Sequence, residues 1–195
     1  MPESLAAFVI AAFALTGSPG PATLGLSAAG AAFGLRRSVA LMTGIIMGVL
    51  IVFAAAAAGL TGLILAQPLL GPMVKALSVA YMLWLAWTIA SAPPLAKGAA
   101  GDAPSFWGGM FLGLGNPKAY AAMAALSSGF ALSAHGMTDA AAKAAILLAV
   151  MIVVDVAWLV AGSALARVMR NPGWSRAINI VFALALLASV AAGFL

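Results

Sequence analysis

Two short proline motifs interrupt an otherwise apolar chain, and each places polar backbone where a helix should be continuous. The motifs are Gly17-Ser18-Pro19-Gly20-Pro21 and Gly115-Asn116-Pro117-Lys118. Proline lacks an N–H and clashes with the carbonyl one turn back, so a helix breaks there. The helix that restarts after the break has free N–H groups and a partial positive charge at its first turn, which favour an anion. The two breaks therefore predict a binding site for an anionic group such as a carboxylate.

The residues that follow each break define the predicted site. Pro21 suits the first position of a new helix, so the amides of Ala22, Thr23 and Leu24 are expected to lack partners. Asn116 is a good N-cap for a helix starting at Pro117, and Lys118 adds a full positive charge. The predicted substrate-binding residues are Pro19, Gly20, Pro21, Ala22, Thr23, Asn116, Pro117, Lys118 and Tyr120. The alternative is that both motifs are kinks that merely let helices pack.

Asp155 is the second candidate for chemistry, because it lies within an apolar run, residues 152–158. A carboxylate at the centre of a membrane costs on the order of 3 kcal/mol on insertion scales, which makes it a candidate functional residue. Lys118 is the only other charge at comparable depth. We expect Asp155 to carry a coupling proton or to bind a substrate ammonium group. A static ion pair between Asp155 and Lys118 is the alternative.

Composition indicates an integral membrane protein. Of the 195 residues, 65% are hydrophobic and 7% are charged, whereas roughly a quarter of an ordinary soluble domain is charged. The net charge of +5 comes from basic residues scattered over short segments, which fits a lipid bilayer partner rather than a nucleic acid. The chain has no cysteine and one histidine, His135, so we expect no metal site, no cofactor and no enzyme activity.

Apolar stretches of about 20 residues predict an all-α polytopic membrane protein with six transmembrane helices. The first (5–28) and fourth (106–131) spans contain the breaks, and a charged loop is expected at 34–37. The other spans are 39–66, 73–92, 139–166 and 177–195. A linker at 96–104 separates two three-helix repeats, 1–95 and 105–195. Because each repeat has an odd number of spans, the second is expected to be inverted relative to the first.

Glycine pairs four residues apart occur in the second and fourth spans, at Gly44/Gly48 and Gly109/Gly113. Small residues at this spacing let helix backbones approach closely, so tight helix packing is expected. Faces rich in glycine and alanine also permit a homodimer without requiring one.

The basic residues predict the orientation. Six follow spans one, three and five, and two lie on the opposite side. The six are Arg36, Arg37, Lys97, Arg167, Arg170 and Arg176, and the two are Lys75 and Lys143. Since the more basic side faces the cytoplasm, both termini are expected outside it. The chain begins Met1-Pro2-Glu3, without the basic start of a signal peptide, so the first span is expected to be retained.

Several motifs, in order along nearly the whole chain, resemble the lysine exporter superfamily of bacterial efflux proteins, especially its homoserine/threonine-resistance type. They are Pro19-Gly20-Pro21, Gly34-Leu35-Arg36-Arg37-Ser38, the 44–48 and 80–85 segments, Phe111–Ala119 with Asn116-Pro117-Lys118, and Asp155 with Trp158. The resemblance implies export of amino acids or their derivatives across the bacterial inner membrane, by exchange for protons. An uncoupled small-solute channel and an exporter of a different metabolite remain alternatives.

Overall fold

The computed structural model describes residues 2–59, 104–165 and 172–192, together with scattered residues between 72 and 91. Every element in the continuous segments is a helix. They are α1 (Pro2–Gly17), α2 (Pro21–Phe33), α3 (Leu35–Ala57), α6 (Phe106–Leu114), α7 (Pro117–Ser128), α8 (Gly136–Leu165) and α9 (Pro172–Ala192). The all-α prediction is therefore confirmed for the described residues. The predicted linker apart from Pro104, the third span as a continuous element, and Lys75, Lys97, Arg167 and Arg170 lie outside them.

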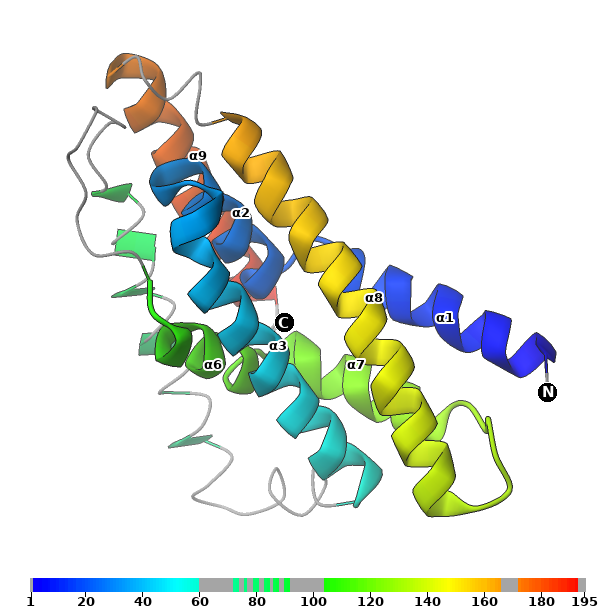
Figure 1. The fold of residues 1–195 in the computed structure, drawn as a ribbon. Helices are drawn as coiled ribbons and strands as arrows, with labels where there is room; N and C mark the ends of the chain where they lie inside the picture. Colours follow the sequence, from blue (N-terminus) through cyan, green and yellow to red (C-terminus); the bar gives the residue numbers. More distant parts are fainter. Residues whose placement is uncertain are drawn as a thin grey trace.

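Helices α3 and α8 are each long and apolar enough to cross a membrane, and both run from one end of the molecule towards the other (Figure 1). Helices α1 and α2 together make a third candidate span, bent by 59° at the first proline motif. Helices α6 and α7 have only 9 and 12 residues and meet at the second motif. The two predicted breaks are thus confirmed as helix interruptions, whereas the count of six spans exceeds what the described residues show.

Two helix boundaries differ from the prediction, one at a pair of charged residues and one at a glycine. The predicted loop at 34–37 is wrong, because Arg36 and Arg37 lie in the first turn of α3 and only Gly34 separates α2 from α3. Gly34 has φ 80°, which lets the chain turn sharply between two helices. Helix α3 then stops at Ala57 rather than at residue 66, since Gly59, at φ 72°, terminates it.

Two further helices begin earlier than predicted. Helix α8 starts at Gly136 and α9 at Pro172, three and five residues before the predicted starts at 139 and 177. Their first turns hold polar or charged residues, which a search for apolar stretches leaves out. A helix tolerates such residues in its first turn, and proline suits that position because its missing N–H would have no partner there.

The helices pack crosswise between the N-terminal set (α1–α3) and the C-terminal set (α6–α9). Helix α3 packs most extensively against α6 and also against α7, while α8 packs most extensively against α2 and also against α1. Each broken pair therefore lies along the long helix of the opposite set: in Figure 1 the green α6 and α7 lie beside the cyan α3, and the blue α1 and α2 beside the yellow α8. This arrangement brings the two breaks together in the interior.

Glycine makes the closest of these contacts possible. A Cβ atom on Gly109 would lie 2.0 Å from the Leu41 carbonyl oxygen, and one on Gly44 would lie 2.0 Å from the Phe106 carbonyl oxygen. Gly48 and Gly113 also face each other, so the two predicted glycine pairs form one α3–α6 contact. The prediction of tight packing is confirmed, and the pairs are partners rather than equivalent features of a repeat.

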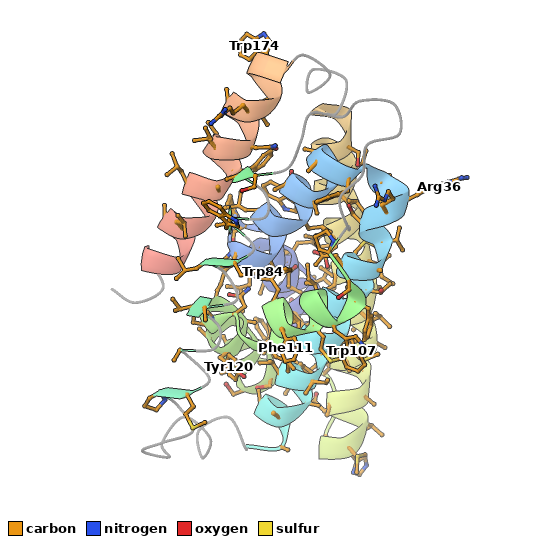
Figure 2. The ribbon with its side chains drawn as sticks, turned by 90° about the vertical axis from the view of Figure 1, so that its left-hand side faces the viewer. Arg36, Trp84, Trp107, Phe111, Tyr120 and Trp174 are labelled. Carbon is orange, nitrogen blue, oxygen red and sulfur yellow. The ribbon has the colours of Figure 1, made fainter. Side chains whose placement is uncertain are left out.

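The outer surface is apolar, as a lipid-facing surface must be. Trp107 and Phe111 are 62% and 59% exposed, and Figure 2 shows them on the flank of α6. Arg36 and Trp174 lie towards one end of the molecule, where α3 and α9 begin. Charged and amphipathic side chains at a helix end, with bare apolar ones along its flank, fit a bilayer environment.

Replacing Gly109 with alanine is predicted to weaken the α3–α6 contact. The new methyl group would collide with the backbone of α3, and overpacking of this kind costs about 1–3 kcal/mol. The melting temperature of the detergent-purified variant measures the loss. Gly136→Ala is the matched control, because nothing lies within 4 Å of the position its Cβ would take. Equal melting temperatures for the two variants would contradict the close contact.

Candidate functional site between the two helix breaks

The first break leaves backbone amides open. Gly20 is extended (φ −170°, ψ 179°), and Pro21 begins α2. The Gly20 N–H donates to Thr23 Oγ1 at 2.9 Å, and the Leu24 N–H donates to the Gly20 carbonyl at 2.9 Å. The expectation of a free Leu24 amide is therefore wrong, because the first helical bond already uses it. The amides of Ala22 and Thr23 have no acceptor among the described residues.

The second break closes its own amides. Asn116 is the N-cap of α7 as predicted, and its Oδ1 accepts the Lys118 N–H at 3.1 Å. The Ala119 N–H donates to the Asn116 carbonyl at 2.9 Å. Because Asn116 satisfies both groups, this break contributes a side-chain ammonium rather than free amides. The two breaks are therefore chemically different.

Two side chains of the C-terminal set bind the carbonyls left open at the end of α1. Lys118 Nζ donates to the Ser18 carbonyl at 2.6 Å, and Trp158 Nε1 donates to the Gly17 carbonyl at 3.1 Å. A cation is favourable there, since the C-terminal end of a helix carries partial negative charge. The Lys118 side chain crosses directly over Gly20, where an added Cβ would lie 3.0 Å from Lys118 Cδ.

A cavity of about 40 Å³ lies between the breaks. Predicted site residues that line it are Gly20, Ala22, Thr23, Asn116, Lys118 and Asp155. The rest of its described wall consists of Leu15, Thr16, Ile45, Val49, Ala119, Ala122, Met123 and Met151. One water molecule needs roughly 10–15 Å³ of cavity volume when the volume is measured with a water-sized probe, so the cavity has room for about three waters.

Four predicted site residues are not part of this wall. Pro19 is exposed, and Pro21 is buried within α2. Pro117 and Tyr120 are half-buried and do not line the cavity, and Figure 2 shows Tyr120 on the flank of the molecule. The prolines matter because they break the helices, which is a backbone role that requires no contact with a ligand.

Most of the aliphatic wall was not predicted from the sequence, although the spacing of residues along each helix contains the signal. Ala122 follows Lys118 by four residues on α7, and Met151 precedes Asp155 by four residues on α8. Residues four apart share a helix face. A charged residue known to face the site therefore identifies its neighbours one turn away.

Asp155 is buried without a complete set of partners. The side chain is 4% exposed, and its Oδ2 has no hydrogen-bond partner among the described residues. No ion pair joins it to Lys118 within that part of the chain, although both side chains face the same cavity. An unpaired carboxylate in an apolar interior is costly, so this one is suited to receive a proton or a ligand cation.

A second lysine, Lys143, is buried and binds carbonyls near the C-terminal end of α7. Lys143 is 2% exposed, pairs with Asp139 at 2.6 Å, and donates to the carbonyls of Ser127 (2.8 Å) and Phe130. Asp139 also accepts the N–H groups of Leu132 and Ser133. Lys143 therefore lies in the second turn of α8 with its charge paired, and its side chain reaches back to the end of α7.

Comparison with known proteins gives the chain its family. Residues 13–195 match the model of the family described as LysE type translocator. The chain belongs to this family. The resemblance to the lysine exporter superfamily is thereby confirmed, and as a member of the LysE type translocators the protein is a transporter rather than an enzyme.

Relatives with assigned roles match most of the chain. The Cysteine/O-acetylserine efflux protein of Salmonella choleraesuis (strain SC-B67) is 30% identical over 171 residues, 87% of each chain. The protein of the same name from Escherichia coli (strain K12) is 29% identical over 187 residues, 95% of each chain. No solved structure matches significantly.

Trp158→Phe is predicted to destabilise the protein, because it removes the N–H donor to the Gly17 carbonyl and keeps most of the ring. An unsatisfied buried carbonyl costs about 1–3 kcal/mol, and each kcal/mol lowers the melting temperature by about 2–4 °C in a chain of this size. Trp107→Phe, at an exposed site, is the control. If the two variants have the same melting temperature, the hydrogen bond from Trp158 to the Gly17 carbonyl does not stabilise the break.

Lys143→Met is predicted to cost about 3–5 kcal/mol, since it leaves Asp139 and two carbonyls without their cation. Adding Asp139→Asn should recover part of the loss, because the two residues form one network. Thermal melting of both single variants and the double variant gives the coupling. Strictly additive losses would mean that the pair contributes nothing to the closure of the loop.

Proposed function

We propose that the protein is a secondary transporter that exports amino acids or their derivatives from the cytoplasm in exchange for protons. The observation that carries the proposal is the pairing of opposite groups around one cavity. Lys118 and the free amides of Ala22 and Thr23 suit a carboxylate, while the unpartnered oxygen of Asp155 suits an ammonium group. An α-amino acid presents both groups on adjacent bonds. The related Salmonella and Escherichia proteins are named as efflux proteins for cysteine and O-acetylserine, which supports this substrate class.

Competition at Asp155 provides the coupling. The buried carboxyl is neutral while it holds a proton, and a neutral carboxyl does not balance the positive charge of a substrate ammonium in an apolar interior. Substrate binding therefore releases the proton, and protonation from the other side of the membrane expels the substrate. Each cycle then moves one substrate outwards and a proton inwards at this residue.

Alternating access would follow from an inverted pair of three-helix repeats, 1–95 and 105–195, in the inner membrane. The crosswise packing supports this, because each broken pair lies on the long helix of the other set. A pseudo-two-fold relation of this kind lets one set rock against the other about a fixed central site. The basic residues Arg36, Arg37 and Arg176 on one side, against Lys143 on the other, would place both termini outside the cytoplasm.

Transport by purified protein in proteoliposomes tests the proposal. The vesicles are loaded with labelled amino acids and a pH gradient is imposed. Asp155→Asn is expected to lose acceleration by the gradient and to weaken substrate affinity about 10- to 100-fold, because a hydrogen bond to a charged group contributes about 1.5–3 kcal/mol. Lys118→Gln is expected to weaken affinity over the same range.

Exposed residues supply the matched controls. Glu3→Gln removes an exposed negative charge and is the control for Asp155→Asn. Arg36→Gln removes an exposed positive charge and is the control for Lys118→Gln. Both variants should transport like the wild type. Gradient-driven transport that persists in Asp155→Asn would remove Asp155 from the coupling step. Wild-type flux that never runs against a concentration gradient would instead identify an uncoupled channel.

A further inference from the structure

We infer that Met123 and Met151 set the size limit for the substrate's side chain, and that the site takes amino acids whose side chains are short and uncharged. The inference rests on the proposed function, because it assumes that the cavity between the breaks binds an amino acid. Met123 and Met151 would thus determine specificity through their size and shape, without hydrogen bonds to the substrate.

Charge limits the substrate first. Lys118 and Asp155 are the only charged side chains among the described residues that line the cavity, and the α-carboxylate and α-ammonium of an amino acid engage both. The hydroxyl groups of the two threonines in the wall already donate hydrogen bonds to backbone carbonyls. Thr16 donates to the Ala12 carbonyl at 2.7 Å, and Thr23 lies 3.2 Å from the Gly20 carbonyl. A second charge on the substrate would be buried without a partner, which is strongly unfavourable.

Size is limited next, because the cavity of about 40 Å³ has room for about three water molecules, which is fewer than the non-hydrogen atoms of even glycine. Some of the wall must move to admit an amino acid. Ile45 and Val49 are β-branched and stiff about their first side-chain bond, the alanines have no side-chain torsion to change, and Leu15 has one rotatable side-chain bond fewer than methionine. Met123 and Met151 have three rotatable side-chain bonds each and can rearrange.

Burial keeps that movement small. Met123 is 1% exposed on α7 and Met151 is 3% exposed on α8, so each can shift only into space within the packed interior. The two residues come from different helices and line the same cavity. The two methionines can therefore rearrange only slightly within the packed interior, and this sets an upper limit on the size of the substrate's side chain.

The test measures kcat/KM for uptake into proteoliposomes across a panel: alanine, serine and cysteine, then leucine, methionine and phenylalanine, then lysine and arginine. The wild type should prefer the first group by about tenfold or more. Met151→Ala and Met123→Ala should each raise the ratio of the phenylalanine to the alanine value by about tenfold, the scale on which apolar pockets discriminate by size. Lysine and arginine should stay poor substrates of every variant.

Met47→Ala is the matched control, because Met47 is 46% exposed on the outer face of α3, and it should leave the ranking unchanged. Met151→Leu keeps nearly the same volume with a stiffer side chain, so it should narrow the accepted range. If an alanine variant does not yield folded protein, Met151→Leu still tests the role of Met151, because it should narrow the range of accepted side chains where alanine should widen it.

The outcomes separate the two claims. A wild type that moves no amino acid would overturn the proposed function itself. Transport of amino acids with lysine or arginine among the best substrates would overturn only the charge limit. A size ranking that is the same in wild type, Met151→Leu and both alanine variants would overturn the role of the methionines.

Discussion

The structure depends on satisfying the polar backbone that two broken helices expose inside an apolar protein. The hydrocarbon of a bilayer offers such groups no hydrogen-bond partner, so the protein, or a cavity within it, must provide one. At the end of α1 the donors are side chains from the other half of the chain: Lys118 binds the Ser18 carbonyl and Trp158 binds the Gly17 carbonyl. The break thereby fixes how the N-terminal and C-terminal helices sit against each other.

The same constraint explains why the two breaks do not duplicate each other. At the start of α7, Asn116 uses its side chain and its carbonyl to bind the nearest amides. At the start of α2 the corresponding position is Gly20, which has no side chain, and the amides of Ala22 and Thr23 remain open. One break therefore keeps backbone donors available while the other supplies Lys118, and the cavity between them combines both.

Close packing holds this arrangement in place. Glycines on α3 and α6 allow backbone contact, and Gly162 on α8 likewise approaches the backbone of Ser27 on α2. Direct contact between helices suits a membrane protein, since apolar side chains gain little by leaving lipid for one another. The site is then built on tightly packed helices rather than on loops.

Sequence reasoning identified the features that have strong local causes. Proline breaks helices wherever it occurs, so the interruptions at residues 18–20 and 115–116 were predictable. Asn116 as an N-cap followed from local chemistry in the same way. Asp155 stood out because a charge in an apolar run is expensive.

Features that depend on tertiary contacts were not predictable. Nothing local to Lys118 indicates that its ammonium reaches a carbonyl a hundred positions earlier. The burial of Lys143 was not predictable either, because its partners at Ser127 and Phe130 come together only when the α7–α8 loop folds back. The aliphatic wall of the cavity was also missed, since an apolar residue in an apolar helix carries no mark of which face it occupies.

The central claim is that both breaks line a single substrate site, and the absence of native cysteines allows a direct test. Ala22→Cys and Ala119→Cys place one thiol at each break, and Ala134→Cys places one in an exposed loop as a control. The rate of labelling by a small thiol reagent is measured with and without substrate amino acid. The account predicts that substrate slows labelling at residues 22 and 119 with the same half-maximal concentration, and leaves residue 134 unaffected. Protection at only one break, or at neither, would contradict a shared site.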